Sequence, residues 1–187
     1  MPLSFAAEIE DLTQILQTER LILREIDASR DAEFLFALLN APKFRKYIGD
    51  RGVRSIEEAA KFADERYMES YRIHGYGLYV VDLKPDDEDP VGSSIGICGF
   101  VRRDTLPEPD IGFAFLPEFE GNGYARESAE AMMQYGRDVL GFERVLAITT
   151  LDNVASIGLL KKLGFTESGL FDTAEGETLR LFSYDSN

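Results

Sequence analysis

A strand, a glycine turn and a long helix in immediate succession constrain the fold most strongly. The apolar segment "DIGFAFL" (110–116) is strand-like, Gly121 and Gly123 follow it, and apolar residues then recur at helical spacing to about Leu140. Glycine has no Cβ, so the backbone can turn tightly and approach a ligand closely. Because the first N–H groups of a helix have no acceptor inside it, this segment predicts an anion-binding site.

The rest of the chain alternates strand-like and helix-like segments. Ser55 and Glu58 form a capping box at a helix start, and Gly164 closes a helix over 153–165. With 187 residues and no repeat or linker, the chain predicts one α/β domain of mixed sheet order. The remaining predicted elements are a helix over 29–39, a loop over 44–54, an exposed acidic hairpin loop over 84–90, and strands at 20–26, 77–83, 93–101, 144–150 and on both sides of a turn at Glu175-Gly176.

Charge and composition exclude several classes of function. The formal net charge is −14, so the average surface repels nucleic acid and anionic lipid, and neither is expected as a partner. One His and one Cys cannot build a Cys/His metal site, and we expect no metal, although a carboxylate-only Mg²⁺ site stays open. There is neither a secretory signal nor an apolar run long enough to span a bilayer, and the single Cys fits a reducing compartment, so we expect a cytoplasmic protein.

Two short motifs match known patterns without their required context. Gly92-Ser93-Ser94-Ile95-Gly96 has the spacing of a nucleophile elbow, but a strand follows it and the only histidine, His74, lies upstream. We therefore interpret Ser94 as a strand-entry serine. Gly121-x-Gly123 begins a dinucleotide fingerprint, but its third glycine position is Arg126, which disfavours nicotinamide binding.

The segment "DIGFAFLPEFEGNGYARESAEAM", followed about thirty residues later by "DNVASIGLLKKLGF", resembles the GNAT superfamily of acyl-CoA N-acyltransferases, most closely its RimJ/RimL-like branch. The likeness runs from about Thr18 to Tyr184. It implies an N-terminal extension at 1–17 and a single N-acetyltransferase domain at 18–187. It also implies an α/β (α+β) fold whose mixed, mostly antiparallel sheet is splayed at the cofactor-binding strand, with helices on both faces.

The resemblance implies acetyl-CoA (coenzyme A) as co-substrate, and assigns its contacts. The strand before the glycine turn pairs with the pantetheine arm through the backbone of Phe115 and Leu116. Asn153 holds the same arm, and Ser156 lies near the thioester sulfur. The pyrophosphate lies on the turn made of Glu120, Gly121, Asn122, Gly123, Tyr124, Ala125 and Arg126.

Two residues depart from the family pattern. Glu120 stands where the family usually has Gln or Arg, so the pyrophosphate would depend on the backbone of the turn. Leu160 stands where a tyrosine often acts as general acid, so a hydroxyl acid would have to be Ser156. Asp110, at the start of the strand, is our first candidate for the general base, ahead of Glu118 and Asp152; a surface carboxylate at a strand end is the alternative.

Other residues keep two interpretations open. Arg102 and Arg103 could steer a substrate or be solvated, and residues 45–52 could shape an acceptor pocket. Lys161 and Lys162 could meet the CoA 3′-phosphate or belong to a solvated helix face. Cys98 is predicted to be a core residue, and His74 to lie at a helix C-terminus.

The resulting hypothesis is an N-acetyltransferase that moves an acetyl group from acetyl-CoA to a primary amine in a ternary complex. The amine would be a protein N-terminus or a small molecule, and the chain a monomer or a homodimer. The alternative is a catalytically silent acyl-CoA-binding or sensing domain on the same fold. Turnover with any amine separates the two.

Overall fold

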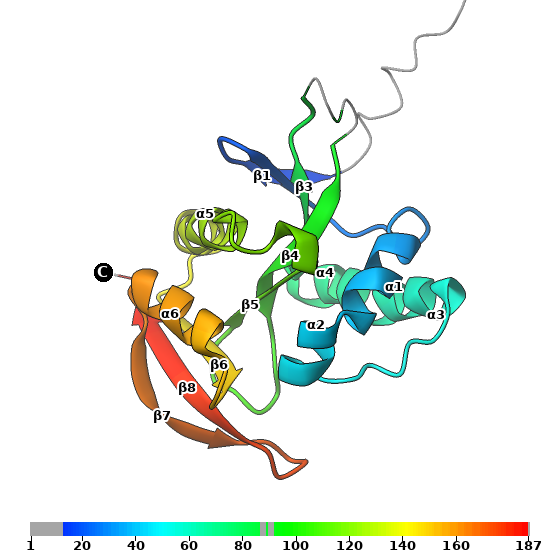
Figure 1. Cartoon of the computed structure of the whole chain (residues 1–187). Coiled ribbons are helices and arrows are strands. Elements are labelled where there is room, and N and C mark those ends of the chain that lie inside the picture. Colours follow the sequence, from blue (N-terminus) through cyan, green and yellow to red (C-terminus); the bar gives the residue numbers. More distant parts are fainter. Residues whose placement is uncertain (1–12, 87–88, 90–91, 187) are drawn as a thin grey trace, which may run out of the picture.

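The fold is built on one open sheet. The computed structural model describes residues 13–86, 89 and 92–186. Neighbouring strands are antiparallel except β5 and β6, which confirms the predicted mixed, mostly antiparallel sheet (Figure 1). In spatial order, the strands are β1 (Gln14–Gln17), β2 (Leu21–Arg24), β3 (Leu78–Leu83), β4 (Ser94–Val101), β5 (Asp110–Phe115), β6 (Arg144–Thr150), β8 (Thr178–Asp185) and β7 (Thr166–Asp172).

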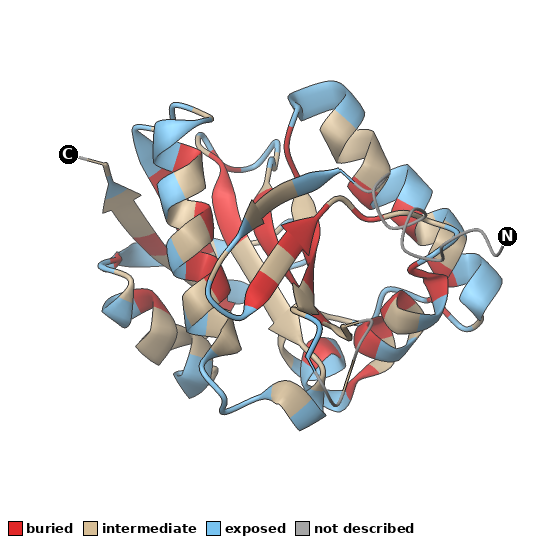
Figure 2. Ribbon diagram, turned by 90° about the horizontal axis from the view of Figure 1, so that it is seen from above, coloured by how far each residue is buried: buried red, intermediate tan, exposed pale blue. Residues whose placement is uncertain are grey.

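Helices cover both faces of the sheet, as expected. Figure 2 shows buried residues along the central strands and on the helices beside them. Apolar residues of β3 and β4 alternate between two cores, so that Val80 and Ile97 face one and Tyr79 and Cys98 face the other. The first core is covered by α1 (Ala32–Asn40), α2 (Pro42–Tyr47), α3 (Ile56–Phe62) and the π-helical turn Ala63–Met68, after which α4 (Glu69–His74) continues the same helix. The second is covered by α5 (Tyr124–Asp138) and α6 (Val154–Lys162).

The sheet is splayed between β5 and β6. Their only recorded strand pair in the described residues is Asp110 with Leu146, and the adjoining Leu146 N–H donates to Pro109 O at 2.9 Å. Past that point the two strands separate toward Phe115 and Thr150. The splay therefore opens at the strand for which the sequence predicted it.

Local signals explain where several helices begin and end. Ser55 Oγ accepts from the Glu58 N–H at 3.1 Å, which confirms the predicted cap of α3. At the end of α6, Gly164 has φ +91°, and the Phe165 N–H donates to Leu160 O at 3.0 Å. This is the Schellman pattern that stops a helix at a glycine, and it confirms Gly164.

Residues 14–17, inside the predicted N-terminal extension, form β1 and pair with β2, and the boundary between extension and domain stays a prediction. One segment differs from the sequence prediction. The predicted loop over 44–54 begins inside α2, because Pro42 starts that helix at its first position, where proline's fixed φ is favourable and its missing N–H is not needed. The predicted acidic hairpin loop lies partly outside the described residues.

A buried ion cluster fixes α1 against the sheet. Arg24 on β2 donates through Nη1 and Nη2 to both carboxylate oxygens of Asp31, at 2.8 Å each, and through Nε to Asp82 on β3 at 2.6 Å. Ser94 Oγ also donates to Asp82, at 2.6 Å, so Ser94 is a strand-entry serine, as interpreted from the sequence.

Candidate active site

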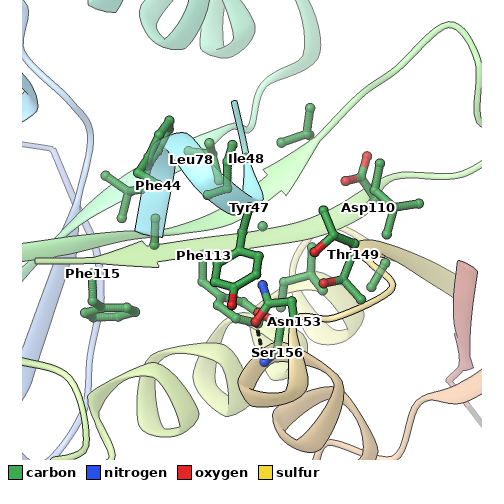
Figure 3. A pocket seen from close by; sticks show the side chains of 18 of the residues that line it. Phe44, Tyr47, Ile48, Leu78, Asp110, Phe113, Phe115, Thr149, Asn153 and Ser156 are labelled. Carbon is green, nitrogen blue, oxygen red and sulfur yellow. Dashed lines mark hydrogen bonds between the residues drawn. The ribbon is translucent and has the colours of Figure 1, made fainter. Parts of the chain in front are cut away.

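The splay forms the floor of a large cleft. Its volume is about 1840 Å³, and α2, the glycine turn and the N-terminus of α6 contribute to its walls (Figure 3). A pocket for one small ligand usually measures about 300–1,000 Å³. The cleft is therefore larger than a single small ligand requires.

The glycine turn presents a row of free backbone donors. Gly121 and Gly123 have φ of +78° and +83°, a conformation that glycine adopts without strain. The first helical bond of α5 runs from the Glu127 N–H to Gly123 O at 3.0 Å. Within the described part of the chain, the N–H groups of residues 121–126 have no hydrogen-bond acceptor, so they can bind an anion.

Arg20 holds this turn against the start of β2. Its Nε donates to Glu127 Oε2 at 2.7 Å, its Nη1 donates to Asn122 O at 3.0 Å, and its guanidinium lies 4.5 Å from the centre of the Tyr124 ring. Thr18 Oγ1 donates to the other Glu127 oxygen at 2.6 Å. The sequence analysis missed Arg20, because a pairing over a hundred residues distant leaves no local signal.

The backbone of β5 supplies donors at alternate residues. The Leu116 N–H donates to Ile95 O on β4 at 2.9 Å, and Leu116 O accepts from the Phe119 N–H at 3.0 Å. Leu116 N–H is therefore occupied within the sheet, and the backbone contact of Leu116 with the pantetheine arm stays a prediction. Since bonded and non-bonded pairs alternate along antiparallel strands, the N–H groups of Phe113 and Phe115 point into the splay.

Asn153 and Ser156 lie together at the N-terminus of α6, on the cleft wall (Figure 3). Asn153 caps the helix, and its Oδ1 accepts from the Ser156 N–H at 3.2 Å. Among the described residues, the Asn153 amide nitrogen and the Ser156 hydroxyl have no recorded hydrogen bond. Both groups can therefore bind a ligand.

Asp110 lies at the closed end of the splay and is only 1 % exposed. Burial raises the pKa of its carboxyl to about 6, although Arg103 Nε, 2.8 Å from Oδ1, opposes that shift. Strand alternation puts Asp110 on the same face as Gly112 and Ala114, which is the face covered by α1 to α4. A carboxyl with this pKa is mostly ionised at pH 7 and is suited to accept a proton.

The weaker candidates for the base have unsuitable surroundings. The Asp152 side chain is exposed, and hydrogen bonds from Lys46 and Thr150 lower the pKa of its carboxyl. Glu118 is exposed and does not line the cleft. Among these carboxylates, Asp110 is the one whose burial favours proton transfer.

The structure also shows the surroundings of the two arginines, the cysteine, the histidine and the two lysines that the sequence analysis discussed. Arg103 is paired with Asp110, and Arg102 Nη1 donates to Leu106 O at 3.0 Å, so neither arginine is simply solvated. Cys98 is buried in the core, as predicted, and burial raises the pKa of its thiol to about 12. His74 ends α4, as predicted, while Lys161 and Lys162 lie exposed on α6 and do not line the cleft.

Two cleft residues were not singled out from the sequence. Thr149 on β6 is 6 % exposed, and its Oγ1 is buried with no hydrogen-bond partner in the described residues. Tyr47, inside the segment predicted to shape an acceptor pocket, projects from α2 into the cleft toward the α6 side (Figure 3). Thr149 lies in a strand of β-branched residues, where threonine is common. The sequence alone therefore does not reveal that its hydroxyl lacks a hydrogen-bond partner.

The described residues offer no candidate for a metal centre or for a membrane-spanning helix. No group of three or more His, Cys, Asp or Glu side chains is arranged to hold a metal ion in these segments. No helix in the described ranges has the length and apolar character needed to cross a membrane.

Comparisons with known proteins agree on the fold and the family. A family profile described as the Acetyltransferase (GNAT) domain matches residues 20–166. The uncharacterized N-acetyltransferase YoaA of Bacillus subtilis is 33 % identical over 159 residues, which cover 83 % of this chain and 85 % of YoaA. Two solved structures share the fold: an acetyltransferase from Agrobacterium tumefaciens (TM-score 0.75, 23 % identity, 91 % and 94 % covered), and RimL, the ribosomal L7/L12 alpha-N-protein acetyltransferase (TM-score 0.76, 18 % identity, 94 % and 95 % covered).

Proposed function

The chain belongs to the GNAT acetyltransferase domain family, whose members are acetyl-CoA-dependent N-acetyltransferases, and we propose that it acetylates a primary amine by direct attack in a ternary complex. The observation that carries this proposal is the alignment of three features along one cleft. These are the free N–H groups of residues 121–126, the donors of β5 that face the splay, and the buried carboxyl of Asp110.

The acyl donor would lie along the cleft from the glycine turn to α6. The turn at residues 120–126 would hold its pyrophosphate through the free N–H groups of residues 121–126, aided by the dipole of α5. The Phe115 backbone and the Asn153 amide nitrogen would hold the pantetheine arm. Acetyl-CoA supplies an acetyl group activated as a thioester, and these contacts orient it toward the splay.

The remaining residues would move protons and stabilise charge. Asp110 would accept the proton that the amine loses, and an N–H of Phe113 or Phe115 would face the developing negative charge on the acyl oxygen. Ser156 would give a proton to the departing sulfur. These roles follow from the free donors and acceptors described above.

The acceptor would be a protein N-terminus or a small-molecule amine, as in the RimJ/RimL-like branch. An α-amine with a pKa near 8 is about one-tenth neutral at pH 7, whereas a lysine near 10.4 is neutral in about one molecule per 2,500. A carboxyl with a pKa of about 6 suits the first better. RimL, a structural neighbour, is named as an alpha-N-protein acetyltransferase. We propose a cytoplasmic enzyme that is a monomer or a homodimer.

Calorimetric titration of acetyl-CoA into the wild type and into Gly123→Glu tests the placement. Glutamate at 123 would add a strained side chain and a negative charge where the pyrophosphate is expected, so we expect binding to be lost. Gly141→Glu is the control, since Gly141 also has positive φ (+71°) but lies outside the cleft lining; an added Cβ meets nothing within 4 Å there, whereas at Gly123 it would lie 3.4 Å from Arg20 Nη2. NAD serves as the ligand control.

Two results would refute the proposal: a wild type that ignores acetyl-CoA, or a Gly123→Glu variant that binds it equally well. A screen of amine acceptors follows. If acetyl-CoA binds and no amine is acetylated, the chain is a silent acyl-CoA-binding domain.

A further inference from the structure

Glu120 puts a negative charge at the start of the anion-binding turn. A carboxylate at this position would repel a diphosphate unless a cation neutralises it. In the structure, Lys43 of α2 reaches across the cleft and forms an ion pair with Glu120 Oε2. The positive charge that balances Glu120 is thus supplied by a different element, α2.

Lys43 differs from the other two cations at the turn. The Arg20 guanidinium is occupied by Glu127 and by Asn122 O, and Arg126 Nε donates to Glu130 at 2.7 Å on its own helix. The recorded partner of Lys43 is Glu120, which belongs to the turn itself. An ammonium group has three donors, so Lys43 has capacity for a second acceptor there.

The Lys43–Glu120 pair is not needed to hold α2 in place. Its side chains are 62 % and 33 % exposed, and an exposed ion pair contributes only about 0–1 kcal/mol. Phe44, the next residue, is 5 % exposed and packs into the core beneath α2. A second ion pair, Lys46 to Asp152 at 3.2 Å, joins the same helix to the opposite side of the cleft.

We propose that Lys43 binds the diphosphate of the acyl-CoA, together with the backbone N–H groups of the turn, and that Glu120 is its partner when the ligand is absent. This inference rests on the proposed placement of CoA on residues 120–126. A diphosphate carries more charge than one carboxylate, so it competes for the ammonium.

Comparing CoA with pantetheine, which lacks the diphosphate, tests the proposal. We expect Lys43→Gln to raise the Kd of CoA about tenfold, in line with the loss of a charge-assisted contact, and to leave the Kd of pantetheine unchanged. Lys43→Arg should restore most of the CoA affinity. Glu120→Gln should tighten CoA binding, since it removes both the repulsion and the competing partner. Competition calorimetry measures all of these constants.

Two lysine variants serve as controls. Lys61→Gln breaks a similar exposed pair, with Glu65 at 3.7 Å; Glu65 lines the cleft, but Lys61 does not, and neither belongs to the glycine turn. Lys46→Gln breaks the pair on the opposite wall. Neither should change the ratio of the CoA and pantetheine constants.

Three outcomes would overturn the role of Lys43: no change in Lys43→Gln, equal loss of both ligands in that variant, or weaker CoA binding in Glu120→Gln. The comparison with Gly123→Glu keeps the two proposals apart. If Gly123→Glu loses CoA and Lys43→Gln does not, the inference about Lys43 fails while the placement of CoA on the turn stands.

Discussion

Burial determines which carboxyl in the cleft can act as a base. Asp110 and Asp152 both line the cleft, yet Asp110 is nine-tenths buried or more, and the Asp152 side chain is 64 % exposed beside Lys46. Burial raises the pKa of the Asp110 carboxyl to about 6, whereas hydrogen bonds lower that of Asp152. Both residues lie near strand ends, so the sequence alone does not tell which of them could act as a base. Their difference in burial, which only the structure shows, decides between them.

Asp110→Asn is therefore expected to lower kcat/KM at pH 7 by about 10²–10³-fold on the best acceptor. In the wild type, activity should fall as the pH drops through about 6, because the protonated carboxyl cannot accept a proton. The variant should lose this acid limb. A pH–rate profile measures both effects, with Asp152→Asn as the cleft-lining control that keeps the limb. Full activity in Asp110→Asn would exclude Asp110 as the base.

Sequence reasoning succeeded where partners are close in the chain. Asn153 and Ser156 are three residues apart, so their shared position at a helix start could be predicted. Arg20 could not, because its partners are Asn122 and Glu127. Whether Phe115 or Leu116 offers a free N–H depends on the register with β4, which the sequence does not contain.

Helical elements show the same dependence on neighbours. Short α2 begins at Pro42 and runs into the segment predicted as a loop over 44–54, and burial of Phe44 stabilises it more than its own propensity does. The longer segments, α5 and β6, were predicted closely because their apolar periodicity extends over many residues. Element type was therefore most predictable where the pattern was long.

Two glycines inside helices should respond oppositely to alanine. A Cβ at Gly158 in α6 meets nothing within 4 Å, so Gly158→Ala should stabilise the fold by about 0.5–1 kcal/mol through helix propensity. A Cβ at Gly136 in α5 would lie 2.6 Å from Phe100 Cζ and 3.2 Å from Phe142 Cδ2, so Gly136→Ala should destabilise it by about 1–3 kcal/mol.

Thermal unfolding of the two variants measures this difference. For a chain of this size, each kcal/mol corresponds to about 2–4 °C in Tm. Equal shifts in the same direction would contradict the packing of α5 against β4.

At the scale of the whole molecule, the reactivity of one buried thiol, that of Cys98, indicates whether the sheet is folded. Cys98, the only cysteine, lies in the middle of β4 and is 0 % exposed. It belongs to the core that α5 covers. Burial raises the pKa of its thiol to about 12, so very little reactive thiolate exists at pH 8. Modification therefore requires the sheet to open.

We expect a disulfide reagent to label Cys98 slowly in the native protein and completely in denaturant. Acetyl-CoA should slow native labelling further, since a ligand of the folded state reduces the open population. Absorbance of the released thiol measures the rate, and the ligand-free protein in denaturant gives the full amplitude. Rapid stoichiometric labelling of the folded protein would show that β4 is less protected than its burial implies.

The splay also bears on self-association. Beyond Asp110, β5 and β6 present two facing strand borders inside the molecule, and such borders elsewhere recruit foreign polypeptide by edge-to-edge pairing. Here α2 bridges the two sides of the opening through Lys43 with Glu120 and Lys46 with Asp152. We expect this bridge to obstruct a further strand, whose side chains project on both faces, more than a slender cofactor arm. A gap that takes up the proposed cofactor would then be a poor site for edge-to-edge aggregation.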